Sequence, residues 1–404
     1  MTTKMPIASY ATQRPKLTTS LAAPAGFTLI EVLIGLALSL IALVVVLQVF
    51  SVSNSRKSVI VGGAEAQQIA SVASFQMGRV FRIGGSGFSN GRSVIGCRIV
   101  ASKSASAILP APAAFAAPFA SVSSTVRVIP VLAYAGAGAN GTDILVTIAD
   151  NAETSTAEYD IDGVPGTASI TLKNTNGIRV NDFLLATDPV DPITTNPADC
   201  TLARVSSAFA AYNYASSPRL ATATVVPLAA SNVYNISGAL STYPLSTRML
   251  NLGQTPSFYI YGLDDKNRLL QKDLLQISGA ADSVMAENIV DFRVLYGVDT
   301  DDNGVLDDWV TPTGVWSAAA LSVGTAAATL KIKQILAMRT AIVVRSTEAA
   351  ADAEPKANYV MFGDIAALKQ TVSIATGQQK RRHQVLESIV SIRNLRLPQA
   401  VPTL

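Results

Sequence analysis

The sequence predicts an α+β protein in which a long N-terminal helix packs on a large β-rich globular head. Residues 27–50 form a nearly uninterrupted apolar run close to the N-terminus. Residues 51–83 continue it with apolar side chains at three- and four-residue spacing, which indicates a helix with one buried face. The remainder of the 404-residue chain alternates short β-type runs with turn-forming residues.

The apolar run is interrupted only by Thr28, Glu31, Ser39 and Gln48. As a helix it would measure about 36 Å, which is enough to cross the hydrocarbon core of a bilayer. Basic residues without acidic ones precede it, so the positive-inside rule predicts residues 1–26 in the cytoplasm and the head across the membrane. An ordinary secretory signal peptide is the nearest alternative, but the run is longer than a usual signal core and no Ala-x-Ala cleavage site follows it directly.

Glu31 is the unusual residue of this segment, because a carboxylate in an apolar span is costly unless it is paired or shielded. Cleavage between Gly26 and Phe27 would create an α-amino group one helical turn from Glu31, or beside Glu31 of a neighbouring copy. Pairing of that amine with the carboxylate between subunits would neutralise both charges. It would also set the axial register of one helix against the next.

The hexapeptide Gly26-Phe27-Thr28-Leu29-Ile30-Glu31, followed by the apolar run, resembles the class III signal of type IV prepilins. The resemblance implies cleavage after Gly26 by the prepilin peptidase, N-methylation of Phe27, and a role for Glu31 in docking into a filament. It also implies four parts: a leader peptide (1–26), a transmembrane and assembly helix (27–50), its amphipathic continuation (51–83) and a periplasmic β-rich head (84–404). A plain single-span anchor is the alternative.

The amphipathic continuation has an apolar face made of Ala66, Ile69, Ala70, Ala73, Met77, Val80 and Phe81. We expect Gly62-Gly63 to be a soft point in this helix and Gly84-Gly85 to end it. Residues 101–125 are rich in Ala, Ser and Pro and predict an extended loop.

Beyond that loop the sequence predicts strands at 125–132, 143–148, 169–172, 178–186, 202–206, 221–227, 257–263, 268–273, 288–298, 340–345 and 383–395. Residues 264–267 predict a hairpin turn, and residues 330–338 a short helix before a strong strand.

Several C-terminal segments resemble PilW-type minor pilins: residues 258–264, 287–292, 296–301, 340–346 and 381–394. Residues 100–250 resemble no family. The resemblance implies a minor pilin of the priming or tip complex of a type IV pilus, with other major and minor pilins as partners. It implies single-pass insertion in the inner membrane of a Gram-negative bacterium and later display on the cell surface. The alternatives are a minor pseudopilin of type II secretion and a filament-borne adhesin or binding module.

Composition argues against other functional classes. Three of the 31 basic residues, Lys4, Arg14 and Lys16, precede residue 27, so the rest of the chain is electrically balanced and has no footprint for nucleic acid. The cluster Lys380-Arg381-Arg382 is best interpreted as a solvated edge. There is no P-loop and no metal-binding histidine pair, because His383 is the only histidine, so we expect no enzyme activity.

Two further features are a pair of cysteines and an acidic loop. Cys97 and Cys200 could form one long-range disulfide in an oxidising compartment, or remain two buried thiols. The run from Asp299 to Asp308 places oxygen ligands at positions 1, 3, 5, 7 and 9 of an EF-hand-like loop, contributed by Asp299, Asp301, Asn303, the Val305 carbonyl and Asp307. Val310 stands where that loop needs a bidentate glutamate. Calcium is therefore the one possible cofactor, and an acidic hairpin turn without an ion is the alternative.

Overall fold

The computed structural model describes residues 26–88, 94–151, 158–188, 195–210, 224–229, 234–235, 239–276, 280–349, 354–392 and 394. The leader expected over residues 1–26 lies outside this set except for Gly26. The chain divides into two compact units, with the boundary between Arg56 and Lys57.

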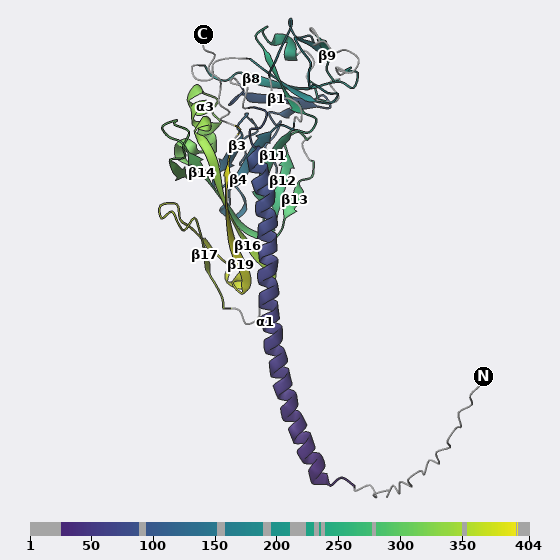
Figure 1. The fold of residues 1–404 in the computed structure, drawn as a ribbon, viewed down its shortest axis with the longest axis vertical. Coiled ribbons are helices and arrows are strands. Elements are labelled where there is room, and N and C mark those ends of the chain that lie inside the picture. Colours follow the sequence, from purple (N-terminus) through teal and green to yellow (C-terminus); the bar gives the residue numbers. More distant parts are fainter. Residues whose placement is uncertain are drawn as a thin grey trace, which may run out of the picture. The chain divides into compact units, whose positions relative to one another are not determined.

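Helix α1 (Leu29–Ile83) contains both the apolar run and its amphipathic continuation (Figure 1). Its part in the first unit is exposed, and the helix is long and apolar enough to cross a membrane. In the second unit the predicted apolar face is confirmed, because Ala66, Ala70, Ala73, Met77 and Phe81 are buried. The helix ends where the sequence predicts, before Gly84, and Gly85 takes the left-handed conformation of a helix stop at φ +78°.

Helix α1 continues through Gly62 and Gly63, where the sequence predicts a soft point. A Cβ atom on Gly62 would lie 3.3 Å from Cβ of Ser346. The missing side chain at Gly62 therefore permits a close approach between helix and head, and does not interrupt the helix.

Within the described residues, the strands of the second unit form three larger sheets and two strand pairs. The first sheet has the order β2 (Ser106–Leu109), β1 (Arg98–Lys103), β8 (Asp199–Arg204), β7 (Phe183–Thr187), β10 (Arg248–Gly253) and β5 (Glu158–Asp160). The second has the order β13 (Ser283–Ala286), β12 (Leu269–Asp273), β11 (Ser257–Leu263), β4 (Ile144–Ala149) and β3 (Val131–Tyr134). The third has the order β15 (Asp308–Val310), β14 (Ile289–Val298), β16 (Ile335–Ala349) and β19 (Arg381–Ser391).

The pairs are β17 (Asn358–Met361) with β18 (Gln370–Ser373) and β6 (Ser169–Leu172) with β9 (Thr224–Pro227). Among the described strands, all pairings are antiparallel except that of β1 with β8. Short helices α2 (Ala318–Leu321) and α3 (Ala326–Lys333) precede β16. Single 3₁₀ turns lie at Ala139–Gly141, Ala239–Thr242, Gly314–Trp316 and Thr376–Gln378.

The main core joins the buried face of α1 to residues of all three larger sheets. A second core lies under β6, β9 and the far part of the first sheet, with Ile170, Val226 and Met249 among its members. A third core lies between β16 and the β17–β18 hairpin and includes Val343 and Phe362. The α+β prediction therefore agrees with a helix packed on a β-rich head.

The predicted extended loop over residues 101–125 is wrong in its first part. Residues Arg98–Lys103 and Ser106–Leu109 pair as the hairpin β1–β2, with Ser104 and Ala105 in left-handed conformations at its turn. The hairpin could not be predicted from the sequence, because its small side chains give little difference in hydrophobicity between its two faces. The later part stays outside the strands, but Phe119 and Val122 are buried and tie it to the main core.

Candidate functional site

The start of α1 is built around Thr28 and Glu31. The Glu31 carboxylate accepts hydrogen bonds from the backbone N and from Oγ1 of Thr28, at 3.1 and 3.0 Å. In return, the backbone N of Glu31 donates to Oγ1 of Thr28 at 3.3 Å. This reciprocal pattern is a capping box, and it satisfies backbone donors that the first helical turn would otherwise leave unpaired. Thr28 was missed as a site residue, although the spacing Thr-x-x-Glu before an apolar run is its sequence signal.

The first unit presents a continuous apolar surface. Phe27 is 85% exposed, and the large apolar side chains that follow it up to Val52 are also exposed. A surface of this size and composition is stable only when lipid or other apolar protein covers it. The expected cleavage and methylation position, Phe27, thus lies immediately before the capping box of an apolar helix.

In the second unit, polar contacts hold the C-terminal half of α1 to the head. The hydroxyl and the backbone N of Thr347 donate to the carboxylate of Glu65, the latter at 3.3 Å. At the helix end, Nδ2 of Asn394 donates to the carbonyl oxygens of Arg82 and Gly84 at 3.1 and 3.2 Å. Asn394 therefore caps carbonyl groups that the last turn of α1 leaves without helical partners.

Cys97 and Cys200 are joined by a disulfide in the structure, with their Cα atoms 5.8 Å apart. Cys200 lies on β8 beside β1, opposite Ile99 in the parallel pairing. Both cysteines are buried. The bond staples the only parallel strand pair among the described residues.

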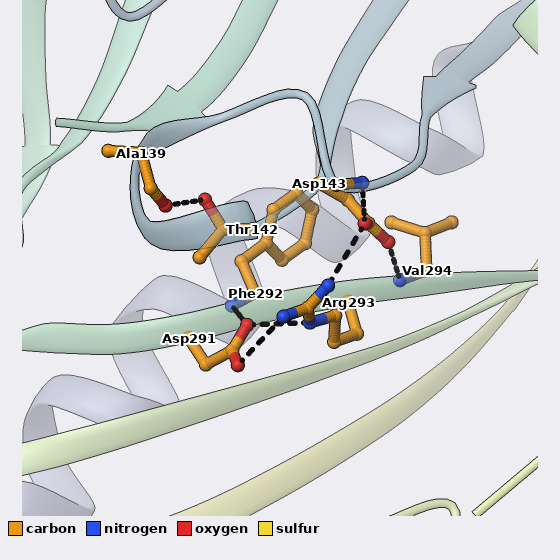
Figure 2. A network of polar contacts seen from close by, with 8 residues as sticks. Ala139, Thr142, Asp143, Asp291, Phe292, Arg293 and Val294 are labelled. Atoms are coloured by element: carbon orange, nitrogen blue, oxygen red, sulfur yellow. Dashed lines mark hydrogen bonds and ion pairs between the residues drawn. The ribbon is translucent and has the colours of Figure 1, made fainter. Parts of the chain in front are cut away.

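A polar network links the β3–β4 turn to β14 (Figure 2). The buried carboxylate of Asp143 accepts hydrogen bonds from the backbone N of Gly136 and of Val294, at 2.8 and 2.9 Å. Arg293 lies between Asp143 and Asp291, with ion-pair distances of 3.6 and 2.8 Å. Burial raises the pKa of Asp143 to about 6 and also raises the pKa of Asp291. The network joins residues far apart in the chain, so no local sequence pattern could have revealed it.

The acidic loop after β14 brings three of its predicted ligands together. Oxygen atoms of Asp299, Asp301 and Asp307 all lie within 4.8 Å of one another. Asp299 accepts from the backbone N of Asn303 and Gly304 at 3.1 and 2.8 Å, which folds the loop around its carboxylate. Gly304 has φ +92°, a conformation that favours glycine at this position.

The donor set fits a hard cation, because carboxylate and amide oxygens are the ligands that calcium prefers. Competing contacts exist within the loop: the backbone N and Oγ1 of Thr300 donate to Asp307, and the backbone N of Val305 donates to Oδ1 of Asn303. The hydrogen bond from the Thr300 backbone lowers the pKa of Asp307, so this carboxylate stays charged. Val310 packs against the main core from β15 and adds no oxygen side chain at the twelfth position.

His383 lies on β19, the edge strand of the third sheet among the described strands. Its Nδ1 lies 2.9 Å from the carbonyl oxygen of Arg381, and its ring centroid lies 5.2 Å from that of Tyr359. Burial and the neighbouring arginines lower its pKa.

Comparison with known proteins gives one positive result. Residues 257–394 match the protein family described as Type IV Pilus-assembly protein W. This segment runs from β11 to just beyond β19 and contributes most of the second and third sheets. No curated protein and no solved structure matches the chain significantly. The match supports a role in type IV pilus assembly and a location in the cell envelope.

Proposed function

We propose that this chain is a minor pilin that enters the priming or tip complex of a type IV pilus. The observation that carries the proposal is the position of Gly26, Phe27 and Glu31 at the start of an apolar helix, in a chain whose C-terminal part matches a pilus-assembly family. In this function the prepilin peptidase cuts between Gly26 and Phe27, and Phe27 becomes N-methylated. The exposed apolar half of α1 anchors the head in the inner membrane until other pilins cover it.

Glu31 has two roles in this proposal. Within one subunit its carboxylate completes the capping box with Thr28. Between subunits the same carboxylate meets the new α-amino group of a neighbouring Phe27 in an apolar surrounding. Pairing of the two charges is favourable there, because neither can be solvated by water once the helices are packed.

The head is proposed to face the periplasm, where the Cys97–Cys200 disulfide can form. The acidic loop is proposed as a weak calcium site on this head, held by Asp299, Asp301, Asn303, the Val305 carbonyl and Asp307. A bound ion would offset the repulsion among these carboxylates and stiffen the loop.

The deciding experiment is the mass and N-terminal sequence of the protein isolated from pilus-producing cells. The expected chain begins at N-methylated Phe27. A Gly26→Ala control that remains uncut at this bond would tie the processing to the signal itself. An unprocessed chain, or one that begins beyond residue 50, would contradict the proposal.

A further inference from the structure

Two neighbouring hollows in the second unit share one aromatic residue, Tyr259 of β11. The first, of about 460 Å³, lies between the C-terminal end of α1 and strands β11, β12 and β13. The second, of about 440 Å³, lies between β11–β12 and residues of the first sheet. Tyr259 lines both hollows, and the two together are called the trough below. Each part has the volume of an ordinary ligand site.

Three of the four charged side chains that line the trough are cationic. Arg79 of α1 lines the first hollow, and Lys103 and Arg204 line the second. Among the described lining residues the only carboxylate is that of Asp273, which accepts hydrogen bonds from the backbone N of Leu275 and from Nε2 of Gln276, at 2.8 and 3.0 Å. Three cations against one engaged carboxylate favour an anionic ligand.

Neutral polar groups outnumber these cations. Gln76, Ser257, Gln271 and Ser283 line the first hollow, and Gln254, Thr255 and Gln276 the second. Oε1 of Gln76 is buried and makes no hydrogen bond with any described residue. Amides and hydroxyls at this density suit a ligand rich in hydroxyl groups.

The aromatic residues of the trough favour a sugar over a single-stranded nucleic acid as the ligand. Phe183 and Tyr234 are buried, with the Arg204 guanidinium 5.6 Å from the Phe183 ring and the Lys103 ammonium 5.0 Å from the Tyr234 ring. Among the described lining residues this leaves Tyr259 as the one partly exposed ring. Single-stranded nucleic acid needs a row of stacking rings and a strongly basic groove, and the trough provides neither.

We propose that the trough binds an acidic polysaccharide. Uronate carboxylates meet Arg79 at one end and Lys103 and Arg204 at the other, a pyranose ring lies against Tyr259, and ring hydroxyls bond to the amides. Arg79, Lys103 and Arg204 lie outside the segment that matches the pilus-assembly family, whereas Tyr259 lies within it. The inference goes beyond assembly, since binding is a property of the second unit alone.

The test is isothermal titration calorimetry of the full-length protein in detergent micelles with a short oligogalacturonate. A neutral maltooligosaccharide of the same length is the comparison ligand. We expect binding of the acidic oligomer only, weakening as salt is added. Tyr259→Leu and Lys103→Gln should each weaken binding about tenfold or more, as expected for the loss of a ring platform or a charge-assisted hydrogen bond.

Arg82→Gln is the control, because Arg82 lies on the same helix as Arg79 and, together with Arg79, lines a third hollow that does not include Tyr259. It should leave the affinity unchanged. Equal losses in Arg82→Gln and Lys103→Gln would reveal charge attraction without a site and overturn the proposal. So would the absence of oligogalacturonate binding, or tighter binding of oligo-dT. Should Tyr259→Leu fail to fold, judged by circular dichroism, Arg79→Gln replaces it. Failure of sugar binding would leave the processing experiment unaffected, and a failure of processing would leave sugar binding unaffected.

Discussion

Arg339 of β16 and Glu387 of β19 together hold the loop that follows β17. Nε of Arg339 donates to Oε2 of Glu387 at 3.0 Å, and Oε1 of Glu387 accepts from the backbone N of Phe362 at 2.7 Å. The same guanidinium donates to both oxygens of Asp364, at 2.8 and 2.6 Å. The Arg339 side chain is 10% exposed and that of Asp364 62%. One buried cation thus ties the β17–β18 hairpin to the third sheet.

We expect Arg339→Met to lower the free energy of unfolding by about 2–3 kcal/mol, because it leaves Glu387 without its charged partner. Amide exchange over residues 358–373 should accelerate first, since this hairpin depends on the contact. Asp364→Asn is the control and should cost much less, because its carboxylate is exposed and screened by solvent. Unchanged exchange in the hairpin of Arg339→Met would contradict this account.

The two roles proposed for Glu31 can be separated by substitution. Glu31→Gln keeps a side chain that can complete a capping box but removes the charge, whereas Thr28→Ala removes the cap and keeps the charge. If charge pairing drives docking, Glu31→Gln should abolish incorporation into pili while Thr28→Ala reduces it modestly. Immunoblots of sheared pili, with membrane-inserted protein as the reference, measure this. The reverse ranking would assign Glu31 a capping role alone.

Reduction of the Cys97–Cys200 disulfide should lower the free energy of unfolding by about 2–4 kcal/mol, because the bond closes a long loop in the unfolded chain. Urea unfolding with and without dithiothreitol measures the difference. The double variant Cys97→Ser, Cys200→Ser should have the same free energy of unfolding as the reduced protein, and dithiothreitol should not change it. A further loss of stability when the double variant is treated with reductant would point to another cause.

Calcium should raise the melting temperature of the full-length protein only at millimolar concentrations, because the twelfth ligand is absent. Asp301→Asn should abolish the shift. Asp302→Asn is the matched control, since Asp302 occupies a non-ligand position and asparagine tolerates its φ of +62°. A shift of equal size with magnesium, or in Asp301→Asn, would show that the loop does not select calcium.

Asp143 should give the protein a specific pH dependence. Its pKa is about 6 in the folded protein and 3.8 as the unperturbed value, so between these values the folded state binds more protons than the unfolded state. The free energy of unfolding contributed by Asp143 therefore falls as pH rises from about 4 to about 6, by up to about 3 kcal/mol.

Asp143→Asn should remove this slope from a series of urea unfolding curves, at the cost of a lower overall stability. Asp364 should have the opposite effect on the pH dependence, because the hydrogen bond from Arg339 lowers its pKa. Its contribution to the free energy of unfolding is lost on acidification, and Asp364→Asn should remove that loss. Identical slopes for the native protein and Asp143→Asn would show that Asp143 does not titrate in this range.

Helix α1 and the hairpin at Asp264–Asn267 were predictable because their signals are local. The buried face of α1 repeats at helical spacing. At the hairpin, Oδ1 of Asp264 accepts from the backbone N of Lys266 and Arg268, and Asn267 takes a left-handed conformation that asparagine tolerates. Strand β2 and the edge strands β13 and β15 were not predicted, since short strands with exposed or small side chains lack a clear period of two.

The same division holds for the candidate sites. Glu31 and the acidic loop are visible in the sequence because their residues follow one another at fixed spacing. The pairing of Asp143 with Arg293 depends on how β4 and β14 meet, which is decided by packing of the whole core. The trough around Tyr259 likewise combines α1, the first sheet and the second sheet, so no single segment predicts it.

The disulfide also has a mechanical consequence under the function proposed above, in which a filament carries the head. A pulling force that enters at α1 and leaves through β11–β19 passes from Cys97 to Cys200 across the sulfur atoms, and bypasses the residues between them. Those cysteines are 103 positions apart, and at about 3.4 Å per residue the bond withholds roughly 350 Å of chain from extension. Under load the head therefore yields much less length while oxidised than its chain would otherwise release.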